Sequence, residues 1–327
     1  MNFENFRRTG ELSDITIIVD KTEFKLHTFP LFTKSDFFKK AVASTTAPYV
    51  IRLDNDFPGG AETFNQLADY FYSIPITIDQ KNIVPLRCAA CFIQCEALST
   101  LLDKRLEEIL TVSRRKSDLG IPLVLLEQCT GELESWAKQA QIIDRCLVCL
   151  VESLARGVGL QLNRSDREVL IRFPLEWIIQ LIELCPKESK LAVLPVVKQY
   201  ITVHVLRTTS NETEQQQQQP VAERSDEEKR AIIDQLIRTL GEAFEQFPLL
   251  WLNSVYEKAV ELHCETESNL ASYITQVMLQ TTDFDHGLEN IPDDVIARLL
   301  ERISKHKDEH IKDPHLLSKV ISFKSKI

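Results

Sequence analysis

Residues 13–42 change from the periodicity of a strand to that of a helix, and this change constrains the fold more than any other feature. The first strand shows apolar residues alternating with their neighbours, at Ile15, Ile17 and Val19. A turn at Asp20-Lys21 should follow, and then a second strand over residues 22–26 with its apolar residues, Phe24 and Leu26, on one face. The apolar residues that follow are spaced as in helices: Leu31, Phe37, Phe38, Ala41 and Val42. With Ser35 as an N-cap, the pattern predicts a β-hairpin followed by a helical hairpin.

Beyond residue 97 the apolar residues recur with a period near 3.6, so the rest of the chain is predicted to be helical. Separate stripes predict helices within 98–110, 119–129, 136–154, 175–185, 191–205 and 232–247. Pro174, Pro248 and Pro292 suit the first turns of helices. The low content of 9 glycines in 327 residues also fits a mainly helical chain.

Residues 208–228 contain almost no apolar side chain and include five consecutive glutamines. Such a segment cannot bury enough apolar surface to offset its chain entropy, so we expect disorder. The predicted organisation is an α+β domain over 1–112, an all-α domain with a first part over 113–206, a disordered linker over 207–228 and a second part over 229–327.

Residues 1–112 resemble a BTB (POZ) domain. The resemblance lies in Ser13-Asp14, in the hairpin that follows and in His27. It implies an α+β BTB/POZ fold, a small sheet capped by helices, here followed by the all-α domain. Because BTB domains commonly dimerise across a two-fold axis, the resemblance also implies a homodimer, to which Phe3 and Phe6 would contribute.

Longer strings resemble the plant branch of BTB proteins, the non-phototropic-hypocotyl adaptors of phototropism signalling. These strings are HTFPL (27–31), FPGGAETF (57–64), LRCAA (86–90), SWAKQAQIIDRC (135–146) and LQTTDFDHGLENIP (279–292). The last two resemble parts of the second domain of that family. The sequence stops at Ile327 without the long coiled-coil tail of typical members, so we expect a short form.

The bulk composition excludes several classes of function. A net charge of −10 argues against a general nucleic-acid binder, because phosphate contacts need clustered lysine and arginine. The one dense basic run, Arg114-Arg115-Lys116, is interpreted as a solvated helix end. No apolar run of about 18 residues predicts a membrane span, and the N-terminal residues do not form a secretory signal. We expect a cytoplasmic protein, with a nuclear or peripheral membrane location left open.

The sequence predicts neither a cofactor nor a metal site. Two sets of cysteines have spacings that metal or redox sites also use: Cys88, Cys91 and Cys95, and Cys146 with Cys149. Both sets lie in apolar helical stripes, which favours buried, reduced thiols. His306 and His310 are surrounded by lysines and indicate a polar helix face. Without a phosphate-binding loop, a nucleophile elbow or a paired-carboxylate cleft, the chain is predicted not to be an enzyme and no catalytic residue is expected.

Asp14 and His27 are predicted to form a buried polar pair at the foot of the sheet. The pair would support the hairpin and, as in related BTB domains, the dimer face. Those domains often place a basic residue after the histidine, where this chain has Thr28. The charged pocket of BTB transcriptional repressors is therefore not expected, and the sequence shows no DNA-binding module.

The resemblance implies a substrate-recognition adaptor of a cullin-3-type ubiquitin ligase. Phe38, Ala41 and Val42, with Tyr49 beyond them, would dock the cullin, while the helical domain would hold a protein target of unknown identity. Many cullin-binding BTB domains carry an apolar-x-Glu motif after this helix. Residues 42–49 contain no glutamate, as is usual in the plant branch. The alternative is a non-enzymatic BTB scaffold that dimerises and assembles signalling partners without ubiquitin transfer.

Two serines are candidate phosphorylation sites. Ser117 follows Arg114-Arg115-Lys116 and so suits a basophilic kinase, whose phosphate would offset part of the basic run. Ser325 lies two residues before Ile327, which suits a phosphoserine-reading adaptor or a PDZ groove.

Overall fold

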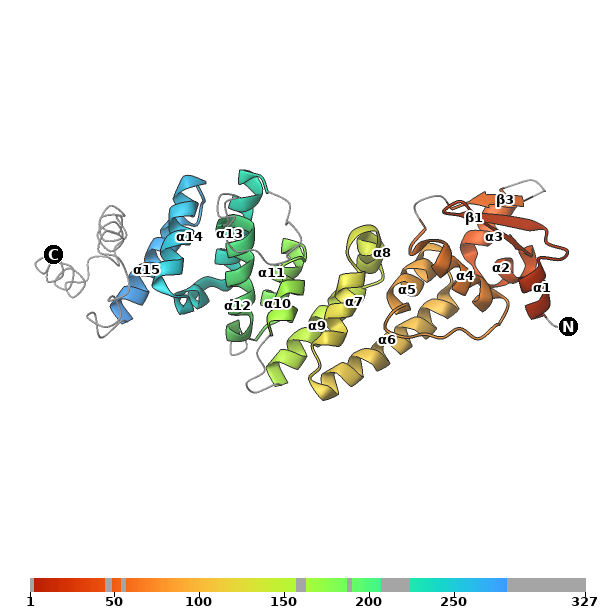
Figure 1. Cartoon of the computed structure of the whole chain (residues 1–327), viewed down its shortest axis with the longest axis horizontal. Coiled ribbons are helices and arrows are strands. Elements are labelled where there is room, and N and C mark those ends of the chain that lie inside the picture. The colour runs from red at the N-terminus through yellow and green to blue at the C-terminus, as the bar shows by residue number, and fades with distance from the viewer. Residues whose placement is uncertain are drawn as a thin grey trace, which may run out of the picture. The chain divides into compact units, whose positions relative to one another are not determined.

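The computed structural model describes residues 3–44, 49–53, 57–156, 163–186, 190–206 and 224–280. The chain divides into two compact units, Met1–Leu160 and Gln161–Ile327, which are described separately here (Figure 1). The first contains a small sheet with helices and the second contains helices in its described residues. The predicted fold class, an α+β module followed by helices in a mainly helical chain, is confirmed.

The sheet of the first unit has three strands in the described residues, in the order β2-β1-β3. These strands are β1 (Ile15–Val19), β2 (Thr22–Leu26) and β3 (Tyr49–Arg52). β1 pairs with β2 in antiparallel and with β3 in parallel orientation. Asp20 and Lys21 both have positive φ, 47° and 69°, as a two-residue hairpin turn of matching twist requires. The predicted hairpin is therefore confirmed.

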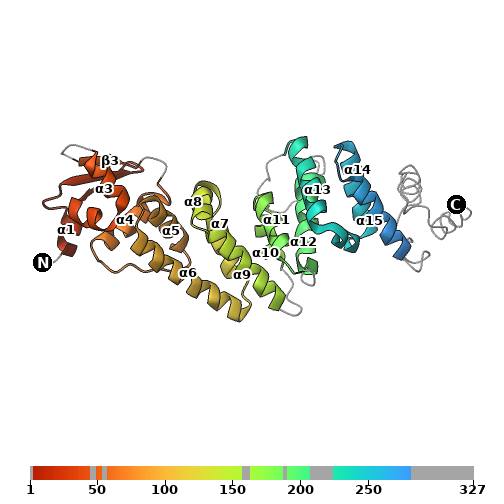
Figure 2. The same cartoon turned by 180° about the vertical axis from the view of Figure 1, so that it is seen from behind.

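Helices α1 to α4 complete the sheet module. They are α1 (Phe3–Thr9), α2 (Thr28–Lys34), α3 (Asp36–Ala43) and α4 (Gly60–Phe71), and the last three lie along one side of the strands (Figures 1 and 2). Ser35 caps α3 as predicted, since its hydroxyl accepts a hydrogen bond from the Phe38 N–H at 3.2 Å. The same hydroxyl donates to the Ile93 carbonyl at 2.6 Å. This buried serine therefore fixes the helical hairpin to the residue that follows α5.

The two glycines of the FPGG string are needed where α4 begins. Gly59 and Gly60 have φ of +77° and +63°, a region that side chains disfavour. A Cβ on Gly59 would overlap Thr63, and one on Gly60 would lie 2.5 Å from Asp20 Oδ2. That carboxylate accepts a hydrogen bond from the Ala61 N–H at 3.0 Å, so the hairpin turn caps α4 directly.

Helices α5 to α9 follow in the same unit. They are α5 (Ile83–Phe92), α6 (Glu96–Lys116), α7 (Gly120–Gln128), α8 (Glu134–Gln139) and α9 (Ile142–Arg156), with a 3₁₀ turn at Gly131–Leu133 before α8. The single helix predicted over 136–154 is wrong: it breaks after Ala140, where Gln141 has a φ of 57°. The break lets the Trp136 ring pack on Phe92, 5.3 Å away, while α9 packs on α6. Leu101, placed in the predicted buried stripe, is 45% exposed.

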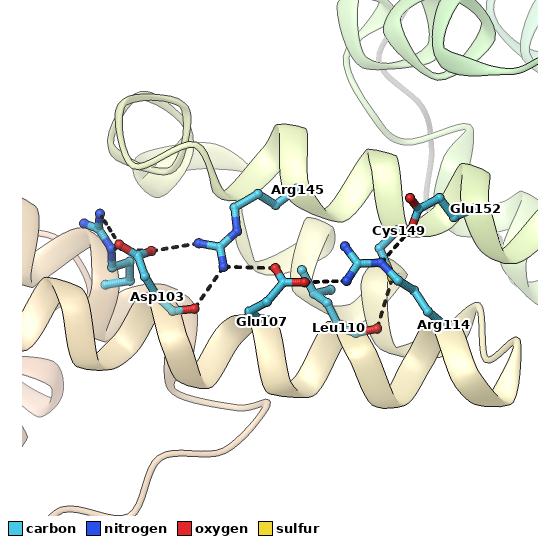
Figure 3. A network of polar contacts seen from close by, with 8 residues as sticks. Asp103, Glu107, Leu110, Arg114, Arg145, Cys149 and Glu152 are labelled. Carbon is cyan, nitrogen blue, oxygen red and sulfur yellow. Dashed lines mark hydrogen bonds and ion pairs between the residues drawn. The ribbon is translucent and has the colours of Figure 1, made fainter.

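The predicted boundary after residue 112 falls inside the continuous helix α6. An alternating chain of charges joins α6 to its neighbours (Figure 3). Arg87 of α5 pairs with Asp103 through two contacts of 3.0 Å, and Arg145 of α9 contacts Asp103 Oδ1 at 2.8 Å. Arg145 also reaches Glu107, which pairs with Arg114. These ion pairs therefore link helices α5, α6 and α9 within the first unit.

Arg145→Lys should lower the free energy of unfolding of the first unit by about 1–2 kcal/mol. Lysine keeps the charge but cannot donate to the Asp103 carboxylate, the Asp103 carbonyl and Glu107 together, as Arg145 does. The expected loss of stability is modest because the Glu107 side chain is 49% exposed. Urea unfolding monitored by Trp136 fluorescence would measure it. Arg105→Lys, at an exposed pair with Glu108, is the control, and an equal loss in both variants would contradict the prediction.

The second unit is helical in its described residues. Its elements are α10 (Arg164–Leu170), α11 (Leu175–Leu184), α12 (Lys190–Ile201), a π-helical turn (Thr202–Leu206), α13 (Asp226–Leu240), a 3₁₀ helix (Gly241–Gln246), α14 (Leu249–Glu261) and α15 (Glu267–Gln280). Pro174 and Pro248 are the N-caps of α11 and α14, one residue before the predicted position. Pro292 lies outside the described residues.

The predicted linker is too long at its C-terminal end. Residues 207–223 lie outside the described residues, but α13 begins at Asp226. Ser225 and Glu228 form a reciprocal capping box that starts this helix. The local capping interaction therefore orders the end of a segment that composition alone assigns to disorder.

Arg224 is held against the π-helical turn. Its Nε donates to His204 Nδ1 at 3.1 Å, and His204 Nε2 lies 2.7 Å from the Ile171 carbonyl. A carbonyl only accepts and an arginine only donates, so His204 is neutral and carries its proton on Nε2. Burial is the main reason that the pKa of His204 lies below its usual 6.5.

Stability of the second unit should therefore fall as the pH drops from 7 to 5. Below pH 6.5 His204 binds a proton in the unfolded chain but not yet in the folded protein. Stability is therefore lost with falling pH until the pH has passed below the pKa of His204 in the folded protein. Thermal unfolding between pH 5 and 8 would measure the slope. His204→Gln can keep both hydrogen bonds without titrating, so it should flatten that slope. An unchanged slope would contradict the assignment.

The described cysteines carry free thiols, and most are buried. Burial of Cys88, Cys95, Cys146 and Cys149 confirms the interpretation of both spaced sets as packed thiols, although Cys91 is only half-buried. Among the residues that the structure describes, no helix combines the length and apolar character needed to cross a membrane.

Candidate functional site

Four large apolar side chains lie exposed on the sheet module, and one of them, Val50 of β3, is 47% exposed. Leu12, between α1 and β1, is 78% exposed, and Phe29 and Phe32 of α2 are 69% and 44% exposed. Phe29 and Phe32 are three residues apart and therefore share one side of α2. Leu12, Phe29 and Phe32, together with Phe6 of α1, are called the aromatic face below.

His27 connects the parts of the aromatic face. Phe6 packs edge-on against its ring at 5.8 Å. Its Nε2 lies 2.8 Å from the Glu11 carbonyl, next to Leu12, and its Nδ1 lies 2.6 Å from the Tyr72 hydroxyl. The backbone N–H of His27 donates to the same hydroxyl at 2.9 Å. Burial is the largest influence on Tyr72 and raises its pKa, so this hydroxyl stays protonated.

The predicted buried pair of Asp14 and His27 is wrong. Asp14 is exposed, and its carboxylate accepts a hydrogen bond from the Thr28 N–H at 2.7 Å. It therefore caps α2, whose own N-cap residue, His27, makes no side-chain cap. Both residues support the helical hairpin, but each does so through a partner of its own.

Helix α1 is fixed to α4 by Arg7. The guanidinium contacts Asp69 at 3.0 Å and donates to the Asn65 carbonyl at 3.2 Å. This attachment orients α1 so that Phe6, which is half-buried, meets His27. The Phe3 side chain lies outside the described residues, so its predicted part in a dimer stays a prediction.

Phe38 cannot belong to a docking surface, which corrects the predicted set. Its side chain is 0% exposed. The ring packs edge-on against Phe37 at 5.2 Å and Phe71 at 5.9 Å. Phe38 therefore belongs to the core, and a partner can contact only the side chains of α3 that stay accessible.

The remaining predicted docking residues are accessible in part. Ala41 and Val42 of α3 and Tyr49, the first residue of β3, are each half-buried. Phe37 is also half-buried and packs on Phe92 at 5.4 Å. Phe37, Ala41, Val42 and Tyr49 are called the α3 face below. Their role in binding a partner stays a prediction.

The aromatic face contains residues that were not singled out from the sequence. Leu12, Phe29 and Phe32 lay close to the recognised strings, but an apolar residue on a short helix does not reveal which side it occupies. The sequence signal for an exposed patch was that α2 has more apolar residues than one side can bury. Pro30 and Leu31 occupy the buried side, so Phe29 and Phe32 lie on the exposed side.

The candidate phosphorylation sites receive little support from geometry. Ser117 is half-buried at the C-terminal end of α6 with a φ of 51°. Arg114, the first basic residue of its motif, is paired with Glu107 and Glu152. A kinase would have to open this end of the helix. Ser325 lies outside the described residues.

Nothing in the described part of the chain groups three or more side chains of the metal-binding kind. Burial raises the pKa of the Cys88 thiol to about 12 and that of Cys264 likewise to about 12. Burial also raises the pKa values of Cys146 and Cys149. These thiols stay protonated near neutral pH, so they are poor nucleophiles and poor ligands until deprotonated. The accessible chemistry of the first unit is therefore that of its aromatic face and α3 face.

Comparison with known proteins agrees with this geometry. The BTB/POZ domain family matches residues 3–110. A BTB/POZ domain-containing protein of Arabidopsis thaliana is 34% identical over 157 residues, which are 45% of this chain and 26% of that protein. A second from the same plant is 31% identical over 171 residues, 49% of this chain and 25% of its own length.

A third relative from Arabidopsis thaliana, whose name also states a BTB/POZ domain, matches a longer stretch. It is 26% identical over 246 residues, which are 69% of this chain and 39% of that protein. The chain thus spans well under half the length of these curated relatives. Residues 3–110 form a BTB/POZ domain, a module for protein–protein interaction, and the chain is a BTB/POZ domain protein with plant homologues.

Proposed function

We propose that the chain is a non-enzymatic adaptor that docks a cullin-3-type ubiquitin ligase through its BTB domain and holds a protein target through its helices. The observation that carries the proposal is a BTB domain with a filled core that still exposes apolar side chains. An adaptor of this kind performs no bond chemistry, since it acts by raising the effective concentration of the target at the ligase.

The α3 face is the proposed cullin contact. Its residues, Phe37, Ala41, Val42 and Tyr49, are only partly covered, and Val42 lies in the last turn of α3. A partner helix or loop could cover these side chains without disturbing Phe38 beneath them. The absence of a glutamate after this helix does not oppose the assignment, because the plant adaptors that the chain resembles usually lack it too.

The aromatic face is the proposed dimer contact. Phe29 at 69% exposure and Leu12 at 78% are unusual for large apolar side chains, and a second copy would remove them from water. In a two-fold symmetric dimer the same patch of each subunit forms the interface, so these few residues would contribute from both subunits. This face favours the alternative as well: a dimeric BTB scaffold needs it and does not need a cullin.

Binding of the purified chain to the N-terminal region of cullin-3 tests the adaptor. We expect micromolar or tighter binding, lost in Val42→Asp and kept in Val124→Asp, which alters a 46% exposed valine of α7. Phe38→Ala is unsuitable because it removes a fully buried ring, so any loss of binding would reflect lost stability. No binding by a chain shown to be folded would leave the scaffold as the function.

Sedimentation equilibrium tests the dimer separately. The chain should be dimeric at micromolar concentration, and Phe29→Glu/Phe32→Glu should make it a monomer with unchanged circular dichroism. Leu101→Glu/Val112→Glu places two charges at exposed apolar positions of α6 and is the control. A double variant that stays dimeric would exclude the aromatic face as the interface.

A further inference from the structure

The second unit contains an open surface pocket of about 560 Å³, a volume typical of ligand sites. It is lined by residues of α10, of α12 with the π-helical turn, and of the segment before α14. The cationic residues of the lining are Arg167 and Lys198, and the apolar ones are Leu191, Leu194, Pro195, Val203 and Phe247. Gln199, Thr202 and Gln246 supply uncharged polar groups.

One face of α12 and the π-helical turn builds most of the pocket. Leu191, Leu194 and Lys198 are spaced by three and four residues, which places them on one side of a helix. Two local irregularities occur along the same stretch. Pro195 lies inside α12, and the π-helical turn begins at Thr202. Such π-helical turns are rare and are often found at functional sites.

The charge of the pocket is one-sided. Its lining contains two cations and no acidic residue, in a chain of net charge −10. The Nε atom of Arg167 is buried without a hydrogen-bond partner. Among the described residues no carboxylate pairs with Arg167 or with Lys198, whereas Arg164, one turn earlier, pairs with Glu168 at 2.9 Å. The charges of Arg167 and Lys198 are therefore not balanced by a carboxylate of the described residues, so an external anion in the pocket would be stabilised.

The apolar part of the pocket has a tightly packed base and an exposed rim. Phe247 is 4% exposed and packs on Trp251 at 4.6 Å, whose Nε1 donates to the Thr202 hydroxyl at 3.0 Å. Leu191 at the rim is 59% exposed. An occupant must therefore present an apolar group to Leu191 and Phe247 together with negative charge to the two cations.

We propose that this pocket binds an acidic peptide segment of a partner protein, with an aspartate or glutamate at Arg167 and Lys198 and an apolar side chain against Leu191, Leu194 and Phe247. An acidic peptide supplies both kinds of group at a spacing of a few residues, and an open groove accepts a chain that enters and leaves. The inference rests on the proposed function in one respect: the segment belongs to the target that the helices hold.

The probe is a pool of fluorescein-labelled ten-residue peptides that alternate Asp or Glu with Leu, Ile or Phe. A second pool carries Asn and Gln in place of the acids. Fluorescence anisotropy with the full chain should show the acidic pool binding at least roughly tenfold more tightly than the amide pool, because charge-assisted hydrogen bonds are involved. Binding should weaken as salt rises.

Arg167→Gln/Lys198→Gln should abolish the preference for the acidic pool. Arg164→Gln/Lys258→Gln removes the same charge at two paired surface cations and should keep it. Equal binding of both pools, or a preference that survives in the pocket variant, would overturn the proposal. Cullin binding by the pocket variant should be unchanged, so failure of the adaptor function and failure of the pocket are seen in different measurements.

Discussion

Replacing Phe38 by alanine is expected to lower the free energy of unfolding of the first unit by about 3–5 kcal/mol. The ring is fully buried among Phe37 and Phe71, and the structure can relax only partly into the space left behind. The loss is a large part of the stability of an ordinary domain, so the variant should unfold at a much lower concentration of urea. Urea unfolding followed by far-UV circular dichroism would measure it.

Phe29→Ala is the matched control for Phe38→Ala. It removes the same atoms from a side chain that is 69% exposed, so stability of the monomer should change by only about 0.5 kcal/mol. Phe29→Ala should instead weaken self-association of the chain. Similar losses of stability in both variants would show that α3 does not bury Phe38 as described.

Asp234→Ala is expected to cost the second unit about 3 kcal/mol. The carboxylate, 7% exposed on α13, accepts hydrogen bonds from the Thr266 N–H at 2.9 Å and the Thr266 hydroxyl at 2.7 Å. It also accepts from the Glu265 N–H at 3.3 Å. These donors lie just before α15, so Asp234 anchors the segment that leads into a helix more than thirty residues later, and alanine would leave them without a partner.

Thermal unfolding of the full chain would measure the loss, which corresponds to a fall in Tm of several degrees for the second unit. Asp226→Ala removes an exposed carboxylate from the first turn of the same helix and should cost under about 1 kcal/mol. Asp234→Asn keeps one acceptor oxygen and should lie between the two. A loss in Asp234→Ala no greater than in Asp226→Ala would contradict this role.

The features that sequence predicted well are local ones. The hairpin over 15–26 and the Ser35 cap depend on residues only a few positions apart, and their patterns are unambiguous. The capping box at Ser225 and Glu228 is equally local, and its spacing was available as a signal against disorder at that point. A few capping hydrogen bonds are enough to start a helix at the end of a segment whose composition is almost wholly polar.

The features that sequence did not predict depend on contacts between distant residues. Asp14 caps α2 and Asp234 anchors the segment before α15, and no local motif marks either carboxylate. Phe29 and Phe38 are both apolar residues of short helices, so their opposite exposures are decided by what each helix packs against. The pocket around Arg167 joins three elements, and its lack of acidic residues is visible only once they are assembled.

Helix α6 spans 21 residues, or about 30 Å, and the end of the BTB/POZ match at residue 110 falls within it. Its N-terminal half packs on α5 and its length carries the charge network to α9. A hybrid protein joined at residue 110 would therefore build one helix from two proteins, and Arg114 and Arg145 would face the residues that the other protein has in place of Asp103 and Glu107. A junction placed beyond α9 would keep the whole charge network in one piece, because Glu152 of α9 is its last member along the chain.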